Sequence, residues 1–119
     1  MEGQRLRLDN IRQATEAIDG VGSGNSAFMA TRAVHINVLI RNVPGEKARS
    51  LKRVYNDIGA EVAISSDAYH EQEGAVTDLI VMGTVYHHRE ARRILAHHSE
   101  TLPLVHLIES ITENAPEMG

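Results

Sequence analysis

Apolar and polar residues alternate from position 34 to position 41, which is the pattern of a β-strand with one buried face. From Glu46 to Ile58 the apolar residues instead recur at intervals of three and four, which predicts an amphipathic helix. The run Asn42-Val43-Pro44-Gly45 separates the two patterns, and Gly59 follows the helix as a C-terminal cap. We therefore predict a strand, a tight turn and a helix in immediate succession.

Further periodic segments lie on both sides of this unit. Residues 4–19 form an amphipathic pattern that ends at Gly20, and a glycine-rich linker follows it. Residues 27–32 either extend the first strand or pack as irregular chain. Downstream, the pattern predicts strands over 61–66, 76–85 and 102–109 and a helix over 88–98. The acidic stretch 67–75 is predicted to be a solvated turn.

The predicted order is one N-terminal helix followed by βαββαβ. Right-handed crossovers convert that order into an antiparallel sheet with two helices on one face. We therefore predict an α+β, ferredoxin-like sandwich in which the first and fourth strands are neighbours. Residues 1–26 would be the N-terminal helix and linker, and residues 27–119 the ferredoxin-like domain.

Composition excludes several classes of function. The net charge of −4 argues against nucleic acid or an anionic membrane as the main partner. Only 3% of the residues are aromatic, and the first and third predicted strands carry none on which bases could stack. The chain has no cysteine, so thiolate metal sites and cysteine nucleophiles are excluded. No segment approaches the roughly 18 apolar residues of a membrane span, and we expect a cytoplasmic protein.

The turn is the main candidate for a binding site. A Pro-Gly pair between a strand and a helix exposes backbone N–H groups, and the helix N-terminus adds partial positive charge. The candidate ligand-binding residues are Asn42, Val43, Pro44, Gly45 and Glu46. The same pair could equally be a sharp turn that lets the helix pack. We find no catalytic motif, and we expect no cofactor.

Residues 34–111 resemble the ACT family of small regulatory domains. The resemblance is carried by the strand Ile36–Arg41, by Asn42-Val43-Pro44-Gly45, by Gly59 after the helix, and by Gly83 at the end of the third strand. The chain has Ala60-Glu61 where the family often has an asparagine. The resemblance implies a βαββαβ domain that senses amino acids or similar effectors.

Seven histidines are the second notable feature, and four of them form the pairs His87-His88 and His97-His98. Ten to eleven residues along a helix span ~15–16 Å, so the two pairs cannot share one ion within a chain. His98 falls on the apolar stripe of the predicted helix and is expected to be packed. We therefore predict no metal site within the chain, while a site between chains remains an alternative.

His35, Arg41 and His106 are secondary candidates. They would share the sheet face that the helices leave open, if the first and fourth strands pair. The apolar residues expected on that face are Leu39, Ile80, Met82, Leu104 and Ile108. Such a patch indicates either a homo-oligomer interface or a ligand pocket rimmed by imidazoles.

Taken alone, the sequence favours a regulatory protein that binds an amino-acid-like effector and works as a homo-oligomer. One alternative is a small enzyme or accessory subunit in which His35 or His106 acts as a general acid or base. The other is a metal-binding protein that uses the histidine pairs.

Overall fold

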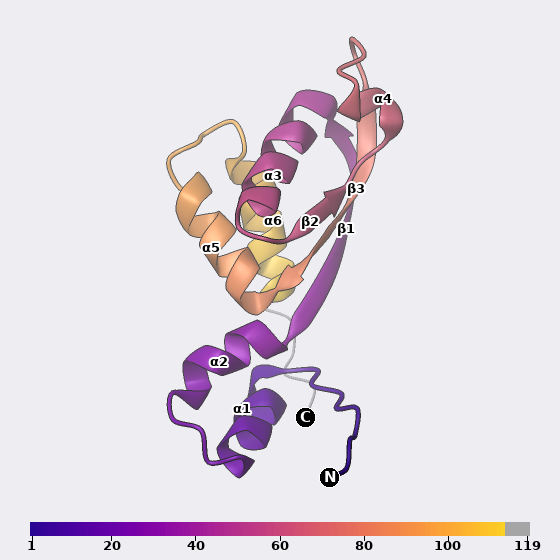
Figure 1. Ribbon diagram of the computed structural model, residues 1–119. Coiled ribbons are helices and arrows are strands. Elements are labelled where there is room, and N and C mark those ends of the chain that lie inside the picture. Colours follow the sequence, from indigo (N-terminus) through magenta and orange to yellow (C-terminus); the bar gives the residue numbers. More distant parts are fainter. Residues whose placement is uncertain (114–119) are drawn as a thin grey trace.

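A computed structural model of the chain describes residues 1–113 (Figure 1). In chain order, its elements are α1 (Ile11–Gly20), α2 (Ser26–Ala33), β1 (His35–Pro44), α3 (Gly45–Asp57), β2 (Glu61–Ala63), α4 (Ser66–Tyr69), β3 (Val76–Thr84), α5 (Val85–Leu95) and α6 (Leu102–Thr112). The three strands form one antiparallel sheet in the order β1-β3-β2. Helices α3, α5 and α6 lie on one side of this sheet, and no other element of residues 1–113 covers the opposite face (Figure 1). The α+β class is therefore confirmed.

The predicted fourth strand is wrong, because residues 102–109 belong to helix α6. This apolar stretch fits both periodicities, but Leu104, Val105 and Ile108 lie at helical spacing and are all buried. Pro103 is tolerated because it lies in the first turn. The described residues therefore form a three-stranded sheet in place of the four-stranded one that the βαββαβ order required.

Several boundaries also differ from the prediction. The first helix begins at Ile11, because the side chain of Asn10 accepts a hydrogen bond from the Gln13 N–H at 2.9 Å and caps it. The ambiguous residues 27–32 lie in helix α2, so neither of the two expected conformations is correct. The second strand stops at Ala63, and the acidic stretch after it begins with the short helix α4.

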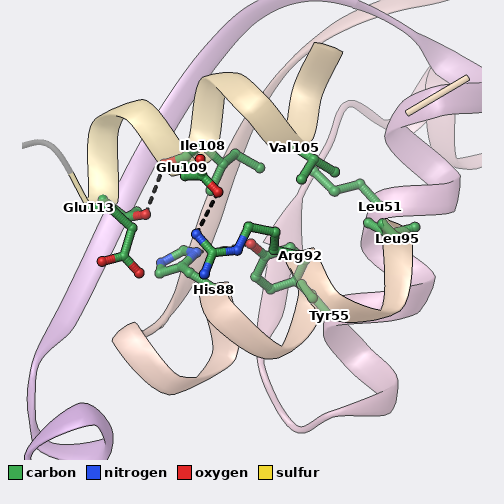
Figure 2. Close-up of a pocket in the computed structure, with 11 residues that line it drawn as sticks. Leu51, Tyr55, His88, Arg92, Leu95, Val105, Ile108, Glu109 and Glu113 are labelled. Atoms are coloured by element: carbon green, nitrogen blue, oxygen red, sulfur yellow. Dashed lines mark hydrogen bonds and ion pairs between the residues drawn. The ribbon is translucent and has the colours of Figure 1, made fainter. Parts of the chain in front are cut away.

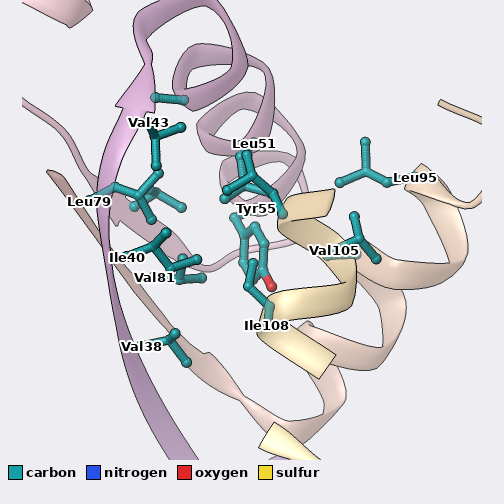
Figure 3. Packing of buried hydrophobic residues seen from close by; sticks show 14 residues of the cluster. Val38, Ile40, Val43, Leu51, Tyr55, Leu79, Val81, Leu95, Val105 and Ile108 are labelled. Carbon is teal, nitrogen blue, oxygen red and sulfur yellow. The ribbon is translucent and has the colours of Figure 1, made fainter. Parts of the chain in front are cut away.

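Buried apolar side chains form two clusters. The larger fills the space between the sheet and its helices (Figure 3), and includes Val38, Leu51, Tyr55, Val81 and Ile108. The smaller joins Ala14 of α1 and Ala30 of α2 to Val34 and Val85 at the end of the sheet. The helix pair α1–α2 therefore has a core of its own, and the molecule is elongated, with extents of 54 × 31 × 25 Å.

A β-bulge interrupts β1 just before it ends. Ile40 lies opposite Leu79 and Val43 opposite Thr77, so β1 carries one extra residue here. Asn42 adopts a left-handed conformation with φ of 59°, and its N–H donates to the Asp78 carboxylate at 3.1 Å. The guanidinium of Arg41 lies 3.6 Å from the same carboxylate. Asp78 therefore holds the bulge from the neighbouring strand and fixes where β1 turns into α3.

Candidate functional site

The predicted ligand-binding residues lie at the junction of β1 and α3. Asn42, Val43 and Pro44 end the strand, and Gly45 and Glu46 begin the helix. The N–H of Gly45 donates to the carbonyl of Ala75 at 2.9 Å, so this first amide already has a partner. Pro44 supplies no side-chain cap to the first turn of α3. The first turn of α3 has no side-chain cap, and its Glu46 carboxylate is the acidic group that complements the helix dipole there.

Gly45 is needed at this junction for space. A Cβ added to it would lie 3.1 Å from the carbonyl oxygen of Ala75 and 3.6 Å from the Cβ of Ala68. These contacts bring the segment before β3 directly against the start of α3. The chain's own backbone therefore approaches Gly45 closely, at the carbonyl of Ala75.

A surface cleft of about 370 Å³ opens beside this junction. The start of α3 forms one wall, and the acidic connection that leads into β3 forms the other. Its lining residues are Pro44, Gly45, Glu46, Arg49, Glu71, Gln72, Glu73, Gly74, Ala75 and Val76. The β-ladder explains the juxtaposition, because Pro44 lies opposite Val76 in the antiparallel register.

The cleft carries charges of both signs, with Arg49 and Glu46 on the α3 wall and Glu71 and Glu73 on the other wall. The Arg49 side chain is only 26% exposed, donates to the Ala68 carbonyl at 2.8 Å and lies 3.9 Å from the Glu71 carboxylate. Glu46, Glu71 and Glu73 are exposed around it. A helix N-terminus and a guanidinium attract a carboxylate, whereas the surrounding carboxylates attract an ammonium group. This arrangement suits a small ligand that carries both charges.

Two of the predicted residues do not line this cleft. Asn42 and Val43 line a neighbouring hollow of about 240 Å³ between the end of β1 and α6, together with Pro44. Conversely, the acidic wall was missed, because residues 71–75 were predicted to be solvated turn. The only signal for it in the sequence was its high density of carboxylates, and the pairing of β1 with β3 was needed to place it.

His88 is the buried histidine among residues 1–113, with an exposed fraction of 4% (Figure 2). Its Nε2 donates to the Ile36 carbonyl at 2.8 Å, so its Nδ1 is the acceptor for the Tyr55 hydroxyl at 2.9 Å. Burial is the main reason that the pKa of His88 is lowered and that the pKa of Tyr55 is raised. His88 on α5 therefore connects β1 and α3 as a neutral imidazole.

The space beside His88 is too small for an organic ligand. The cavity measures about 10 Å³, which corresponds to about one water molecule. Its lining includes the ion pair in which Arg92 of α5 lies 2.5 Å from Glu109 of α6 (Figure 2). Glu113, just after α6, also lines it and lies 2.6 Å from Arg89. The contacts of Tyr55 and His88 therefore hold elements together and leave no room for a substrate.

His97 and His98 do not lie in the predicted helix. Helix α5 ends at Leu95, so His97 and His98 lie beyond it and are exposed. The prediction that His98 is packed is wrong, because the chain leaves the helix before that position. Its Nδ1 lies 3.6 Å from the Glu100 carboxylate. Within residues 1–113, no three histidine, aspartate or glutamate side chains converge as a metal site would require.

The expected meeting of His35 and His106 depended on the missing fourth strand. His35 lies on the open sheet face and contacts Asn37 through Nε2 at 2.9 Å. His106 is an exposed residue of α6, in the helix layer. Arg41 lies on the open face beside Asp78. The structure therefore does not join the two imidazoles across paired strands.

The open sheet face carries part of the predicted apolar patch. Leu39 and Ile80 lie opposite each other in the ladder and are 49% and 41% exposed, and Met82 is partly exposed. Leu104 and Ile108, which were expected on this face, are buried under α6 in the main core. The patch is therefore smaller than predicted.

Comparisons with protein-family models, with curated proteins and with solved structures gave no match to this chain. Across residues 1–113, none of the helices combines the length and apolar character needed to cross a lipid bilayer.

Proposed function

We propose that this protein is a regulatory protein that binds a small amino-acid-like effector and acts as a homo-oligomer in the cytoplasm. The proposed site is the cleft between the start of α3 and residues 71–76. The observation that carries the proposal is the position of this cleft at the Pro44-Gly45 junction, where the Arg49 guanidinium and the carboxylates of Glu71 and Glu73 line one space. Apart from the short helix α4 between β2 and β3, the order β1-α3-β2-β3-α5 also agrees with the first five elements of an ACT-like domain.

The chemistry of the walls suggests how an α-amino acid would be oriented. Its carboxylate would lie towards the first turn of α3 and Arg49, where the helix dipole and the guanidinium both favour negative charge. Its ammonium group would lie towards the carboxylates of Glu71 and Glu73. A volume of about 370 Å³ falls within the range of small-molecule sites. The proposal therefore predicts a preference for zwitterions over simple carboxylates or amines.

A thermal-shift screen with single L-amino acids, matched carboxylic acids and matched amines tests this proposal. A ligand at 100 times its Kd stabilises the folded state by about 2.7 kcal/mol, which gives a clear shift. Calorimetric titration of the best amino acid would then compare the wild type with Glu73→Gln, which removes one carboxylate from the cleft. Glu16→Gln on the exposed side of α1 is the matched control.

We expect Glu73→Gln to weaken binding about tenfold, as for the loss of one charge-assisted hydrogen bond, and Glu16→Gln to leave affinity unchanged. Equal affinity of the two variants would place the site elsewhere. A screen in which no zwitterion raises the melting temperature would overturn the proposed effector class.

A further inference from the structure

The long strand β1 leaves one edge of the sheet open. Among the described residues β1 pairs with β3 alone, and a ferredoxin-like sheet would have placed its fourth strand on the other side. From His35 to Ile40 the strand is regular, and the bulge at Arg41 and Asn42 and the proline at position 44 occur only at its end. Unpaired backbone groups along such an edge are a template for another strand. The usual protections, which are proline, an early bulge and several charges, are missing from this stretch.

Helix α6 carries a second apolar stripe beside this edge. Leu104, Val105 and Ile108 face the core, and Glu109 faces α5 through its ion pair with Arg92. Pro103, Leu107 and Ile111 recur at intervals of four residues on another side of the helix and are all exposed, the last two by 44% and 37%. The apolar side of α6 is therefore wider than the part that the core buries, while His106, Glu109 and Ser110 form the polar side of the helix.

The stripe and the open edge are continuous. Pro103, Leu104 and Leu107 line the hollow of about 240 Å³ together with residues 40–44 of β1. Because α5 lies on the other side of α6 and contacts β3, the stripe borders the edge of β1 that has no strand partner. The backbone edge and the apolar helix side thus form one surface, which we call the β1–α6 surface.

We propose that the β1–α6 surface binds a second copy of this chain. The two β1 strands would pair antiparallel and join the sheets into one of six strands, and the two α6 helices would cover each other's exposed stripes. A single two-fold axis would satisfy both contacts, as an isologous dimer requires. A partner for this surface must present a free strand edge and an apolar helix side in the same relative position. A second copy of this chain meets both requirements.

The side chains of β1 are compatible with their own antiparallel copy. In the register centred on Leu39, this leucine lies opposite itself, and Val38 lies opposite Ile40 of the second copy on the other face. Asn37 lies opposite Arg41, so an amide oxygen faces a guanidinium donor. No carboxylate of β1 is placed against another, since the strand contains none. The pairing therefore brings apolar residues and hydrogen-bonding partners together without like-charge contacts.

This interface specifies how the homo-oligomer in the proposed function would form. Its existence does not depend on the effector, and only its role in regulation rests on the proposed function. β1 ends at Pro44, which lines the effector cleft, so the strand is shared by the cleft and the interface. An effector that shifts the junction of β1 and α3 would act on the end of the paired strand.

Sedimentation equilibrium of the full chain at micromolar concentration tests the interface. We expect the wild type to have twice the chain mass of 13.1 kDa. Leu107→Lys and Leu39→Lys should each reduce the mass to that of one chain, because each places two like charges near the axis. The control Val21→Lys, at a residue that is 84% exposed between α1 and α2, should remain dimeric. Circular dichroism establishes that the variants are folded.

A charge-swap experiment tests the register directly. Leu39→Lys and Leu39→Glu should each be monomeric alone, and an equimolar mixture should recover the dimer mass. A dimer that stacks the open sheet faces would be dissociated by Leu39→Lys but not by Leu107→Lys. A Leu107→Lys protein that keeps the dimer mass would therefore overturn the proposal. A monomeric wild type would overturn it as well.

The same samples separate this proposal from the effector proposal. Titration of the wild type with the best amino acid reports the cleft, whereas the sedimenting mass reports the interface. A dimer that binds no zwitterion would refute the effector alone, and a monomer that binds one would refute the interface alone.

Discussion

At the scale of single residues, His88 and Asn42 each hold distant parts of the chain in a defined geometry. His88 connects β1 to α3 by accepting from one group and donating to another, which requires the neutral imidazole. Asn42 occupies a left-handed conformation that most residues adopt only with strain. Both residues therefore make predictions that depend on their own chemistry.

We predict that stability falls with acidification below about pH 6.5, the ordinary pKa of histidine, because of His88. Its pKa is lowered in the folded chain, mainly by burial, so the unfolded chain takes up the proton first as the pH falls. The stabilisation is therefore complete above about pH 6.5 and is lost as the pH falls towards the folded-state pKa. Urea denaturation at about pH 7.5 and about pH 5.5 measures the difference.

The variant His88→Gln should show a smaller difference between these two conditions. His87, whose pKa is also lowered chiefly by burial, retains its own contribution with the same sign. His106→Gln, at an exposed position, should keep the full wild-type difference. An unchanged difference in His88→Gln would mean that His88 is not the group that titrates.

We predict that Asn42→Val lowers the free energy of unfolding by about 1–2 kcal/mol, because a β-branched residue is strained at positive φ. Asn42→Gly is the matched variant, and its free energy of unfolding should exceed that of the Val variant by at least about 1–2 kcal/mol, because glycine tolerates positive φ. Chemical denaturation of both proteins provides the comparison. If the two variants were equally stable, the left-handed conformation of the bulge would be refuted.

At the scale of elements, α6 decides the architecture of the molecule. A strand over 102–109 would have extended the sheet, whereas the helix fills the third position in the layer with α3 and α5 (Figure 1). Its position is secured by Leu104, Val105 and Ile108 in the core and by two ion pairs to α5. The open edge of β1 follows directly from this choice.

We predict that Ile108→Ala lowers the free energy of unfolding by about 2–5 kcal/mol, because it removes a buried side chain from the main core. Val105→Ala should also be clearly destabilising, because helix α6 buries both Leu104 and Val105. In a strand, these two neighbouring residues would point to opposite faces and could not both enter the same core. His106→Ala should change stability by less than about 0.5 kcal/mol. Denaturant titrations give the three values, and a neutral Val105→Ala would contradict the helix.

At the scale of the whole molecule, the chain consists of a sheet body and a helical hairpin with separate cores. The radius of gyration is 16.2 Å, whereas a compact domain of this length has about 13.5 Å. The excess arises because α1 and α2 pack on each other at one end of the sheet (Figure 1). The two parts meet at Val34 and Val85, and Phe28 and Arg32 of α2 also pack against Tyr86 of α5.

We predict that a chain lacking residues 1–33 still unfolds cooperatively, at a lower melting temperature. The main cluster contains no residue from α1 or α2, so its packing survives the truncation. Hydrogen exchange should show retained protection of β1 and β3. Ala14→Asp in the full chain, which places a charge at a fully buried position between α1 and α2, should lose protection in the hairpin alone. Loss of protection throughout the sheet would show that the two parts fold as one.

Elements with an unambiguous periodicity could be predicted from the residue pattern. Alternation identified β1 and β3, helical spacing identified α3, and the Pro44-Gly45 pair marked the junction between β1 and α3. The exposure of Leu39 and Ile80 also followed from alternation, because successive residues of a strand point to opposite faces. The position of the candidate site at Pro44, Gly45 and Glu46 therefore followed from the local pattern of residues alone.

Three features depend on long-range contacts: the helical state of residues 102–109, the identity of the buried histidine and the second wall of the cleft. A short apolar stretch satisfies two periodicities, and contacts with the core and with Arg92 selected the helix. Likewise, the register of β1 against β3 brought residues 71–76 to Pro44 across some thirty positions of sequence. Periodicity is set by local backbone geometry and is present in the sequence, whereas these three outcomes depend on which distant residues meet.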